Sequence, residues 1–393
     1  MDHKKFILPV IVFSQFCCTS LWFAGNSVIN ELIGQFGLQA SALSHLTSAV
    51  QLGFIIGTLV FALFTIADRF SPSKVFFFSA LAGAMLNAGI LFPSQNLLSL
   101  LSFRFLTGFF LAGIYPVGMK IATDYYADGL GKSLGFLVGA LVLGTAFPYL
   151  LKGSAFLIPW KWVIVATSVM AFSGGTLILS LVPDGPFRKQ GKGLAISSAF
   201  SVFKNRGLRA AAFGYFGHMW ELYAFWAFLP IVLKAYAEKH PTSVFSVPFV
   251  TFFIIAIGGA GCMLAGLAAH RFGSKKIAFI ALLFSGLCCL LSPILLNFHS
   301  YSILLAFFLF WGFTVTADSP LFSTLVANNA SAEMKGTALT IVNCIGFAIT
   351  IVSIQLLGFL SNVMNSQYLF LILGIGPILG LLALLKIKPL RAY

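Results

Sequence analysis

Apolar residues run through this chain in twelve long blocks, which shorter polar stretches separate. A helix needs about 20 predominantly apolar residues to cross the hydrocarbon core of a bilayer, and each block is near that length. Because water does not reach that core, each block is expected to satisfy its own backbone groups as a helix. The runs are too long and too uniformly apolar for the alternating strands of a membrane β-barrel. The predicted spans are roughly 6–28, 45–67, 74–92, 97–122, 133–152, 162–183, 207–233, 247–269, 277–297, 302–327, 337–360 and 368–386.

Ionisable residues follow a second pattern, because those well inside a block fall only in blocks four, seven and ten. A charge near the bilayer centre is expensive and is usually retained for a function. Their confinement to every third span indicates spans that surround one polar cavity, which favours a transporter. These residues are Arg104, Lys120, His218, Glu221 and Asp318.

The composition excludes a soluble protein of this size, because 59% of the 393 residues are hydrophobic, 9% are charged and the mean hydropathy is +0.98. The net charge of +14 does not indicate nucleic-acid binding, because the basic residues cluster on one side of an even-numbered topology. That clustering is the positive-inside bias. We therefore expect an integral protein of the cell (inner) membrane with both termini in the cytoplasm. The clustered residues include Lys4, Lys5, Arg69, Lys74, Lys132, Arg188, Lys189, Lys192, Lys204, Arg206, Arg209, Arg271, Lys275, Lys276, Lys335, Lys386, Lys388 and Arg391.

The first block imitates a secretory signal peptide, but it is too long and no small-residue cleavage site follows it. We therefore expect an uncleaved first helix. All six cysteines lie inside predicted spans, so we expect them to pack as small apolar residues rather than to form disulfides.

The longest polar stretch, residues 184–206, divides the spans into six and six. It opens with an Asp-Gly-Pro sequence that ends a helix. Four apolar residues within it recur at helical spacing, which predicts a short amphipathic helix on the cytoplasmic surface. Those four residues are Ile196, Ala199, Phe200 and Phe203. The predicted organisation is an N-terminal six-helix bundle at 1–183, this linker, and a C-terminal six-helix bundle at 207–393.

The two groups of six spans repeat each other. The stretch Ala67–Lys74 follows the second span, and the similar stretch Ala269–Lys276 follows the eighth. Duplicated six-helix halves are a known transporter architecture, with the binding site at the interface of the repeats.

On these motifs the chain resembles the major facilitator superfamily over essentially its whole length. The resemblance implies an all-α membrane protein with twelve transmembrane helices in two six-helix, pseudo-symmetric halves. The loop signature of the family is roughly G-x-x-x-D-R-x-G-R-K, and Asp68 and Arg69 match its charged pair. Phe64 and Pro72 stand where the signature has its first glycine and its second arginine, and the second copy has histidine in place of the acid. The resemblance implies a cytoplasmic gate that stabilises the outward-open state, with the residues Asp68, Arg69, Asp124, His270 and Arg271.

The same resemblance implies that spans one, four, seven and ten line the central cavity. Polar residues of span one agree with this, because they recur at intervals of four, three and four residues and so share one helical face. Spans three, six, nine and twelve carry few polar side chains, as expected of helices that face lipid. The expected substrate-binding residues are Gln15, Trp22, Asn26, Arg104, Tyr115, Lys120, His218 and Asp318.

Glu221 is the first candidate for proton coupling, and Asp318 is the second. Removal from water favours a neutral carboxylic acid, so a carboxyl group in mid-span can take up a proton near neutral pH. His218, one turn before Glu221, is its natural proton partner. The alternative for Glu221 is a permanent ion pair that holds the bundle together. The alternative for Lys120 is a side chain that reaches the cytoplasmic interface.

These patterns predict a secondary active transporter that moves a small organic anion or zwitterion by alternating access, with proton-coupled uptake. The mixed signs of the candidate residues are the reason to prefer such a solute to a neutral sugar. A Gly-Pro pair typical of drug antiporters is missing from span five, which favours uptake over the alternative of proton-coupled efflux of metabolites or drugs. A transporter-like receptor without turnover and an intramembrane enzyme are the rival classes. No phosphate loop or metal-ligand cluster occurs in the sequence, so we expect no cofactor or metal, and a monomer whose partners are substrate, protons and lipid.

Overall fold

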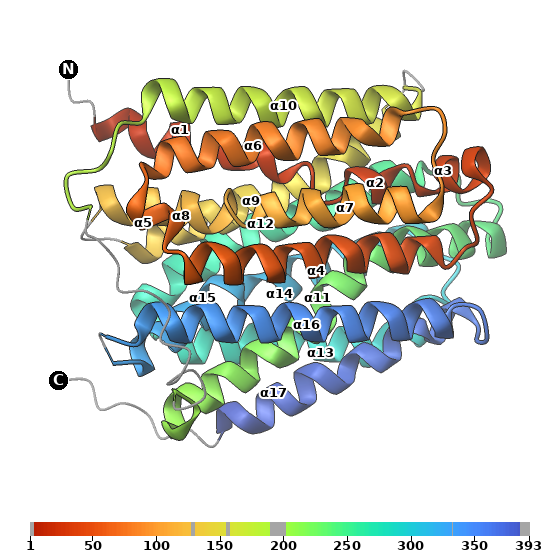
Figure 1. Cartoon of the computed structure of the whole chain (residues 1–393). Helices are drawn as coiled ribbons and strands as arrows, with labels where there is room; N and C mark the ends of the chain where they lie inside the picture. The colour runs from red at the N-terminus through yellow and green to blue at the C-terminus, as the bar shows by residue number, and fades with distance from the viewer. Residues whose placement is uncertain (1–3, 127–129, 155–157, 189–201, 332, 386–393) are drawn as a thin grey trace.

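The computed structural model of the chain describes residues 4–126, 130–154, 158–188, 202–331 and 333–385. The long helices lie side by side in one bundle (Figure 1). The start of α1 (Lys4–Thr19), α5 (Ile66–Arg69) and the end of α17 (Ile375–Leu385) lie at the same end of this bundle, which we call the terminal face. The other end, which carries α3 (Ile29–Phe36), is called the opposite face.

Every regular element in the described ranges is helical, and the elements divide into two halves at the linker. The N-terminal half contains α1, α2 (Ala24–Ser27), α3, α4 (Ala42–Leu63), α5, α6 (Pro72–Ala88), η1 (Gly89–Leu91), α7 (Leu97–Leu111), α8 (Tyr115–Tyr125), α9 (Leu130–Gly153) and α10 (Trp160–Leu181). The C-terminal half contains α11 (Arg206–Lys239), α12 (Val247–Phe272), α13 (Ser274–Leu295), α14 (Tyr301–Ala317), α15 (Ser319–Asn329), α16 (Lys335–Leu360), η3 (Ser366–Gly374) and α17.

Eleven helical stretches in the described part of the chain are long and apolar enough to cross a bilayer, which confirms predicted spans two to twelve. The prediction of one continuous helix over 6–28 is wrong, because α1 ends at Thr19 and the chain continues through α2 and α3. Span seven is longer than predicted, because α11 continues past the apolar block to Lys239. The predicted amphipathic helix of the linker lies mostly at residues 189–201, outside the described residues.

Prolines divide spans four and ten into two helices each, with Pro116 in the first turn of α8 and Pro320 in the first turn of α15. Proline has no N–H, so the carbonyl four residues earlier loses its helical partner. For Pro320 that carbonyl belongs to Thr316, and the Cys262 thiol donates to it over 3.1 Å. The helix breaks therefore place irregular backbone in the middle of the bundle, where neighbouring side chains can satisfy it.

The predicted repeat is visible in equivalent helix contacts of the two halves. A Cβ on Gly108 of α7 would lie 2.1 Å from the Val50 carbonyl oxygen of α4. A Cβ on Gly312 of α14 would lie 1.9 Å from the Ile254 carbonyl oxygen of α12. Gly108 lets spans two and four approach at backbone distance, and Gly312 does the same for spans eight and ten, which are their equivalents in the second half.

The two halves meet through α4 with α16 and through α9 with α12. Near the opposite face, the Gln355 Nε2 of α16 donates to the Ser44 carbonyl oxygen over 3.1 Å and to the Ser48 Oγ over 2.8 Å. A Cβ on Gly153 of α9 would lie 2.5 Å from the Phe249 backbone nitrogen of α12. The halves are therefore in close contact at the opposite face.

Candidate functional site

A small pocket lies between the two halves, with a volume of about 40 Å³. The N-terminal half contributes α8 and α9 to its wall, and the C-terminal half contributes α11, α15 and α16, with Thr316 at the end of α14. None of the described side chains that line this central pocket carries a charge. The lining residues are Tyr115, Val138, Leu141, Val142, Tyr215, Met219, Leu222, Tyr223, Trp226, Thr316, Ser319, Ser323, Asn343 and Phe347.

Aromatic rings from both halves cover the pocket on the side of the opposite face. The Trp22 ring of span one stacks on Tyr223 and on Phe347, each with ring centroids 5.7 Å apart. Trp226 lies one turn beyond Tyr223 along α11, towards the opposite face, and its ring packs edge-on against Tyr223 at 5.3 Å. This cover and the contacts of Gln355 together close the pocket from the opposite face.

A second cavity, of about 570 Å³, opens at the terminal face between the two halves. Its wall includes Pro116 of α8, which directly follows Tyr115 in the wall of the central pocket. It also includes Thr340 of α16, one turn before Asn343, which lines the central pocket. The cavity at the terminal face and the central pocket are therefore lined by neighbouring residues of α8 and α16.

His218 and Asp318 form a buried pair at the wall of the central pocket. The His218 Nδ1 lies 2.8 Å from the Asp318 Oδ1, and each side chain is 1% exposed. Their chain neighbours Met219 and Ser319 line the pocket. Among the described residues no further partner is recorded for the His218 Nε2 or the Asp318 Oδ2. The pair therefore places a buried acid and a buried base next to the pocket wall.

Glu221 does not line the central pocket, and the expectation that His218 is its partner is wrong. Its carboxylate lies inside the C-terminal half, where Trp311 Nε1 donates to the Oε1 over 2.6 Å and Ser285 Oγ donates to the Oε2 over 3.0 Å. The Cys289 thiol also donates to the Oε1, over 3.4 Å. These donors belong to α13 and α14, so Glu221 points away from the interface of the halves, and its recorded hydrogen-bond donors in the described chain are uncharged.

Arg104 is also turned away from the central pocket. Its guanidinium donates through Nη1 to the Leu21 carbonyl oxygen over 3.0 Å and through Nη2 to the Trp22 carbonyl oxygen. These two carbonyls lie in the break between α1 and α2, where they have left the helical hydrogen-bond ladder. The expectation that Arg104 contacts an anionic substrate is therefore not supported by its position, because it completes the backbone of the broken span one.

Two other predicted residues of span one are buried between helices. The Asn26 Nδ2 donates to the Thr47 Oγ1 over 2.7 Å, within the N-terminal half. The Gln15 amide lies against α8, where a Cβ on Gly118 would come within 2.4 Å of its Oε1. Tyr115 is the one residue predicted for substrate contact in spans one and four that the described wall of the central pocket includes.

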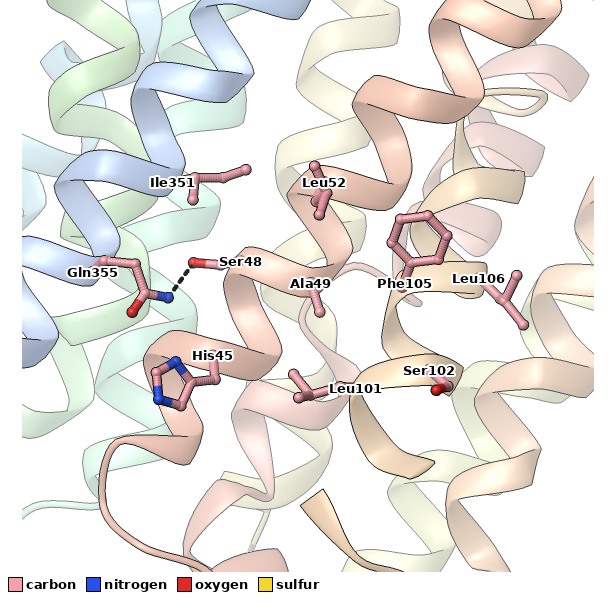
Figure 2. Close-up of a pocket in the computed structure, with 10 residues that line it drawn as sticks. All are labelled: His45, Ser48, Ala49, Leu52, Leu101, Ser102, Phe105, Leu106, Ile351 and Gln355. Carbon is pink, nitrogen blue, oxygen red and sulfur yellow. Dashed lines mark hydrogen bonds between the residues drawn. The ribbon is translucent and has the colours of Figure 1, made fainter. Parts of the chain in front are cut away.

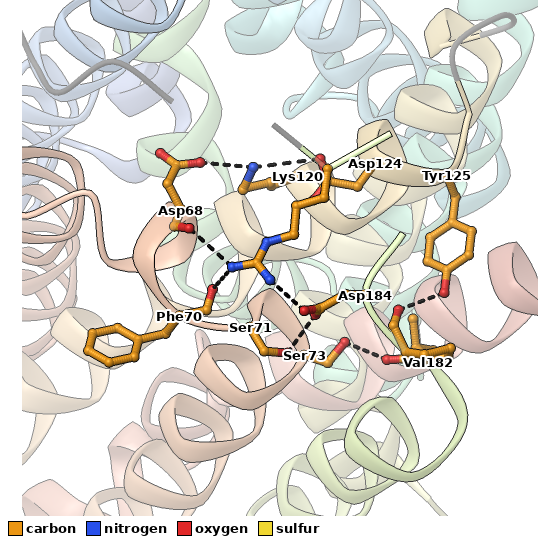
Figure 3. A network of polar contacts seen from close by, with 11 residues as sticks. Asp68, Phe70, Ser71, Ser73, Lys120, Asp124, Tyr125, Val182 and Asp184 are labelled. Carbon is orange, nitrogen blue, oxygen red and sulfur yellow. Dashed lines mark hydrogen bonds and ion pairs between the residues drawn. The ribbon is translucent and has the colours of Figure 1, made fainter. Parts of the chain in front are cut away.

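Two predicted gate residues of the N-terminal half, Asp68 and Asp124, belong to one ionic network at the terminal face (Figure 3). The Lys120 Nζ lies 2.9 Å from the Asp68 Oδ1 and 3.6 Å from the Asp124 Oδ1. Arg188 donates to the backbone oxygens of Asp68 and Phe70, over 3.1 Å and 2.8 Å. Lys120 therefore belongs to this network rather than to the central pocket, and the expectation that it binds substrate is not supported by its position.

The remaining predicted gate residues lie outside this network. Arg69 is on α5, and the described residues show no ion pair for it. His270 and Arg271 end α12, where the Arg271 guanidinium lies 5.4 Å from the centroid of the Phe272 ring.

Most polar residues of the pocket wall were not predicted as substrate contacts from the sequence, among them Tyr215, Ser323 and Asn343. The Tyr215 hydroxyl donates to the Asn343 Oδ1 over 2.9 Å, and Ser323 lies one turn after Ser319 on α15. Asn343 gave a usable signal, because an amide side chain in the middle of an apolar span is uncommon. Tyr215 gave another, because it precedes His218 by three residues and so shares its helical face.

Comparisons with known proteins agree on the family. The family model described as Major Facilitator Superfamily matches residues 11–354 and 211–392. The human organic anion transporter MFSD10 (TETRAN) is 14% identical, with a TM-score of 0.76 over 98% of this chain and 100% of that one. The proton:xylose symporter XylE is 15% identical, with a TM-score of 0.73 over 99% of this chain and 96% of that one.

A curated relative is YyaJ of Bacillus subtilis (strain 168), a protein named for metabolite transport. It is 27% identical over 150 residues, which are 36% of this chain. The match spans about a third of the length of that relative, 32%. The two solved structures show the fold, and the family match covers nearly all of the chain. The chain belongs to the major facilitator superfamily and is an integral membrane transporter rather than an enzyme.

Proposed function

We propose that the protein is a proton-coupled secondary transporter that takes up a small polar solute by alternating access. The observation that carries the proposal is the His218–Asp318 pair, 2.8 Å apart and fully buried at the wall of the pocket between the halves. A buried acid and base at a repeat interface are typical of a proton relay in a transporter. Proton transfer to Asp318 removes the attraction between the pair, and both residues are adjacent in sequence to side chains of the pocket wall.

We further propose that the solute is neutral rather than anionic or zwitterionic. The preference for an anion or zwitterion rested on Arg104, Lys120, His218, Glu221 and Asp318 lining one cavity. Arg104, Lys120 and Glu221 have their contacts elsewhere, and His218 and Asp318 pair with each other. The wall offers hydroxyl, amide and aromatic groups, which suit a solute with hydroxyl groups and an apolar face. The names of the similar proteins include a xylose symporter, an organic anion transporter and a protein named for metabolite transport, so both solute classes belong in the test.

The sidedness follows from the basic residues, which cluster at the terminal face in the sequence-based topology. On that basis the terminal face is cytoplasmic, and the conformation described here is closed to the outside and open to the cytoplasm. Thiol labelling of a Lys192→Cys variant from outside intact cells tests this, because Lys192 lies in the linker and should not react. Strong labelling would reverse the topology.

The solute can be found by a thermal-shift screen of neutral sugars and polyols against small carboxylates and amino acids on purified protein. A ligand at 100 times its dissociation constant should add about 2.7 kcal/mol to the free energy of unfolding. Flux of that ligand in proteoliposomes then tests coupling. We expect accumulation only with a pH gradient that is acidic on the uptake side. Accumulation that ignores the gradient contradicts proton coupling, gradient-driven export supports efflux, and binding without flux supports a receptor.

A further inference from the structure

A groove separate from the two cavities described above lies between three of the helices that are long and apolar enough to cross a bilayer, and Figure 2 shows the side chains that line it. Its volume is about 580 Å³, within the range of ~300–1,000 Å³ that is typical of small-molecule sites. The walls are α4 and α7 of the N-terminal half and α16 of the C-terminal half. It has no lining residue in common with the central pocket. Leu52 and Leu106 in its wall are 46% and 39% exposed, so the groove opens to the lipid.

The groove is polar at one end and apolar at the other. His45, Ser48 and Ser102 lie in the first turns of α4 and α7, which enter the bundle from the opposite face, and Gln355 lies near the end of α16 at that same face. Ala49 and Leu101 are the chain neighbours of Ser48 and Ser102 at this end, and one turn or more deeper the lining residues are Leu52, Phe105, Leu106 and Ile351. The polarity gradient therefore runs along the membrane normal, from the surface at the opposite face towards the bilayer centre.

We propose that this groove binds one phospholipid from the leaflet at the opposite face. Its acyl chain lies along the apolar wall, and its phosphate and ester oxygens reach the polar end. The surrounding bilayer presents molecules with this polarity and orientation to the groove at all times. The His45 ring can donate a hydrogen bond to such oxygens. The Ser48 hydroxyl can do so as well, because it accepts the Gln355 amide and no acceptor for its own proton is recorded among the described residues.

A lipid in this groove touches both halves at the place where they meet. The Gln355 contact with Ser48 and Ser44 lies at its polar end and joins α16 to α4. An occupant that packs against all three helices is expected to stabilise the conformation closed at the opposite face, since movement of the halves separates its walls. The proposal does not depend on the solute or on proton coupling.

Native mass spectrometry of the full-length protein in mild detergent tests the proposal, with phosphatidylethanolamine and phosphatidylglycerol as probes. We expect one phospholipid to remain on the wild-type protein after delipidation. Ala49→Trp fills the groove from α4, and Ser102→Trp fills it from α7. Each should raise the dissociation constant for the lipid by about tenfold, equivalent to about 1.4 kcal/mol, and so lower the lipid-bound fraction. Val169→Trp is the matched control, because Val169 is a 56% exposed residue of α10 away from the groove.

Thermal unfolding of the same four proteins, with and without the added phospholipids, provides the second readout. The wild type and Val169→Trp should gain stability from lipid, and the two groove variants should not. Ser102 is exposed, so its tryptophan variant should fold even if Ala49→Trp overpacks the groove. The proposal is overturned if the wild type retains no phospholipid, if both groove variants retain it, or if Val169→Trp loses it equally. Displacement of the phospholipid by a transported solute would also overturn it, and would assign the groove to the transport path.

Discussion

Glu221 and Asp318 are both fully buried acids of the C-terminal half, but they have different partners. Glu221 accepts hydrogen bonds from an indole, a hydroxyl and a thiol, and points into its own half. Asp318 contacts the imidazole of His218 and lies where α14 and α15 meet, beside the pocket between the halves. The first arrangement stabilises one packing of three helices. The second joins two groups that can each gain or lose a proton.

The comparison teaches that mid-span position alone does not identify a coupling residue. Both acids satisfy that criterion, and the sequence ranks Glu221 first. The partners reverse the order, because a proton that moves to or from Asp318 changes a contact at the pocket wall. A proton on Glu221 changes contacts among α11, α13 and α14 within one half.

The largest effect is expected for Asp318→Asn, which keeps the volume of the side chain but removes its charge and its titration. Accumulation driven by a pH gradient should fall to the level of protein-free liposomes. Exchange of labelled solute at equal pH should persist, because binding and movement of the halves do not need the proton. Glu221→Gln is the matched control and should still accumulate solute. The opposite result, with Asp318→Asn active and Glu221→Gln uncoupled, would restore Glu221 as the coupling site.

The next effect concerns stability. His218→Gln removes the base of a buried pair and leaves the Asp318 carboxyl group buried without its ionisable partner. This should lower the free energy of unfolding by about 3–5 kcal/mol. Adding Asp318→Asn should recover most of this loss, because two neutral amides can hydrogen-bond with each other. Chemical unfolding of the single and double variants in detergent measures the interaction energy between the two side chains. Additive losses in the double variant would show that the two side chains do not interact.

A smaller effect is expected around Glu221. Trp311→Phe removes the shortest of its recorded donors, at 2.6 Å, and should cost about 1–3 kcal/mol of stability while the coupling ratio stays unchanged. Ser285→Ala is the control within the same cluster and should cost less, because its hydroxyl lies at 3.0 Å and also donates to the Leu282 carbonyl oxygen. A change in coupling ratio in Trp311→Phe, without loss of stability, would contradict the packing role of Glu221.

Much of the fold was predictable from the sequence, because crossing a bilayer depends on the apolar length of each segment. The breaks at Pro116 and Pro320 were readable for the same local reason, since proline acts on its own helix. The break in span one was not readable, because Ser20-Leu21-Trp22-Phe23 contains no glycine or proline. It coincides with the contact of Arg104 with two carbonyls from 82 and 83 positions away in the chain.

The candidate site was predictable only in part. Of the expected residues, Tyr115 lines the central pocket and the pair of His218 and Asp318 lies beside it, whereas Arg104, Lys120 and Glu221 have their contacts elsewhere. Helical spacing shows which residues share a face, and it does not show which neighbour that face meets. His218 and Glu221 are one turn apart, yet one meets α15 at the interface and the other meets α13 and α14. Asn343 was missed because span eleven was not among the spans that the family resemblance assigns to the cavity.

The smallest effect on stability is expected at the terminal face, where Asp68 is a partly exposed acid. Its side chain is 24% exposed and its ion pair with Lys120 lies within the N-terminal half, so Asp68→Asn should change the free energy of unfolding by about 0–1 kcal/mol. Its effect should appear in the conformational equilibrium instead. The family resemblance assigns Asp68 to the outward-open state, so the variant should populate the conformation open at the terminal face more often.

Spin labels at Ala62 and Thr340, on α4 and α16 in the wall of the cavity at that face, should report more of the longer distances. Glu238→Gln is the control, because Glu238 is an exposed acid whose ion pair with Lys234 lies at the other end of α11 from the terminal face and does not line the cavity. An equal shift in both variants would reduce Asp68 to one surface charge among several, and no shift in either would leave it the role of an ordinary loop residue.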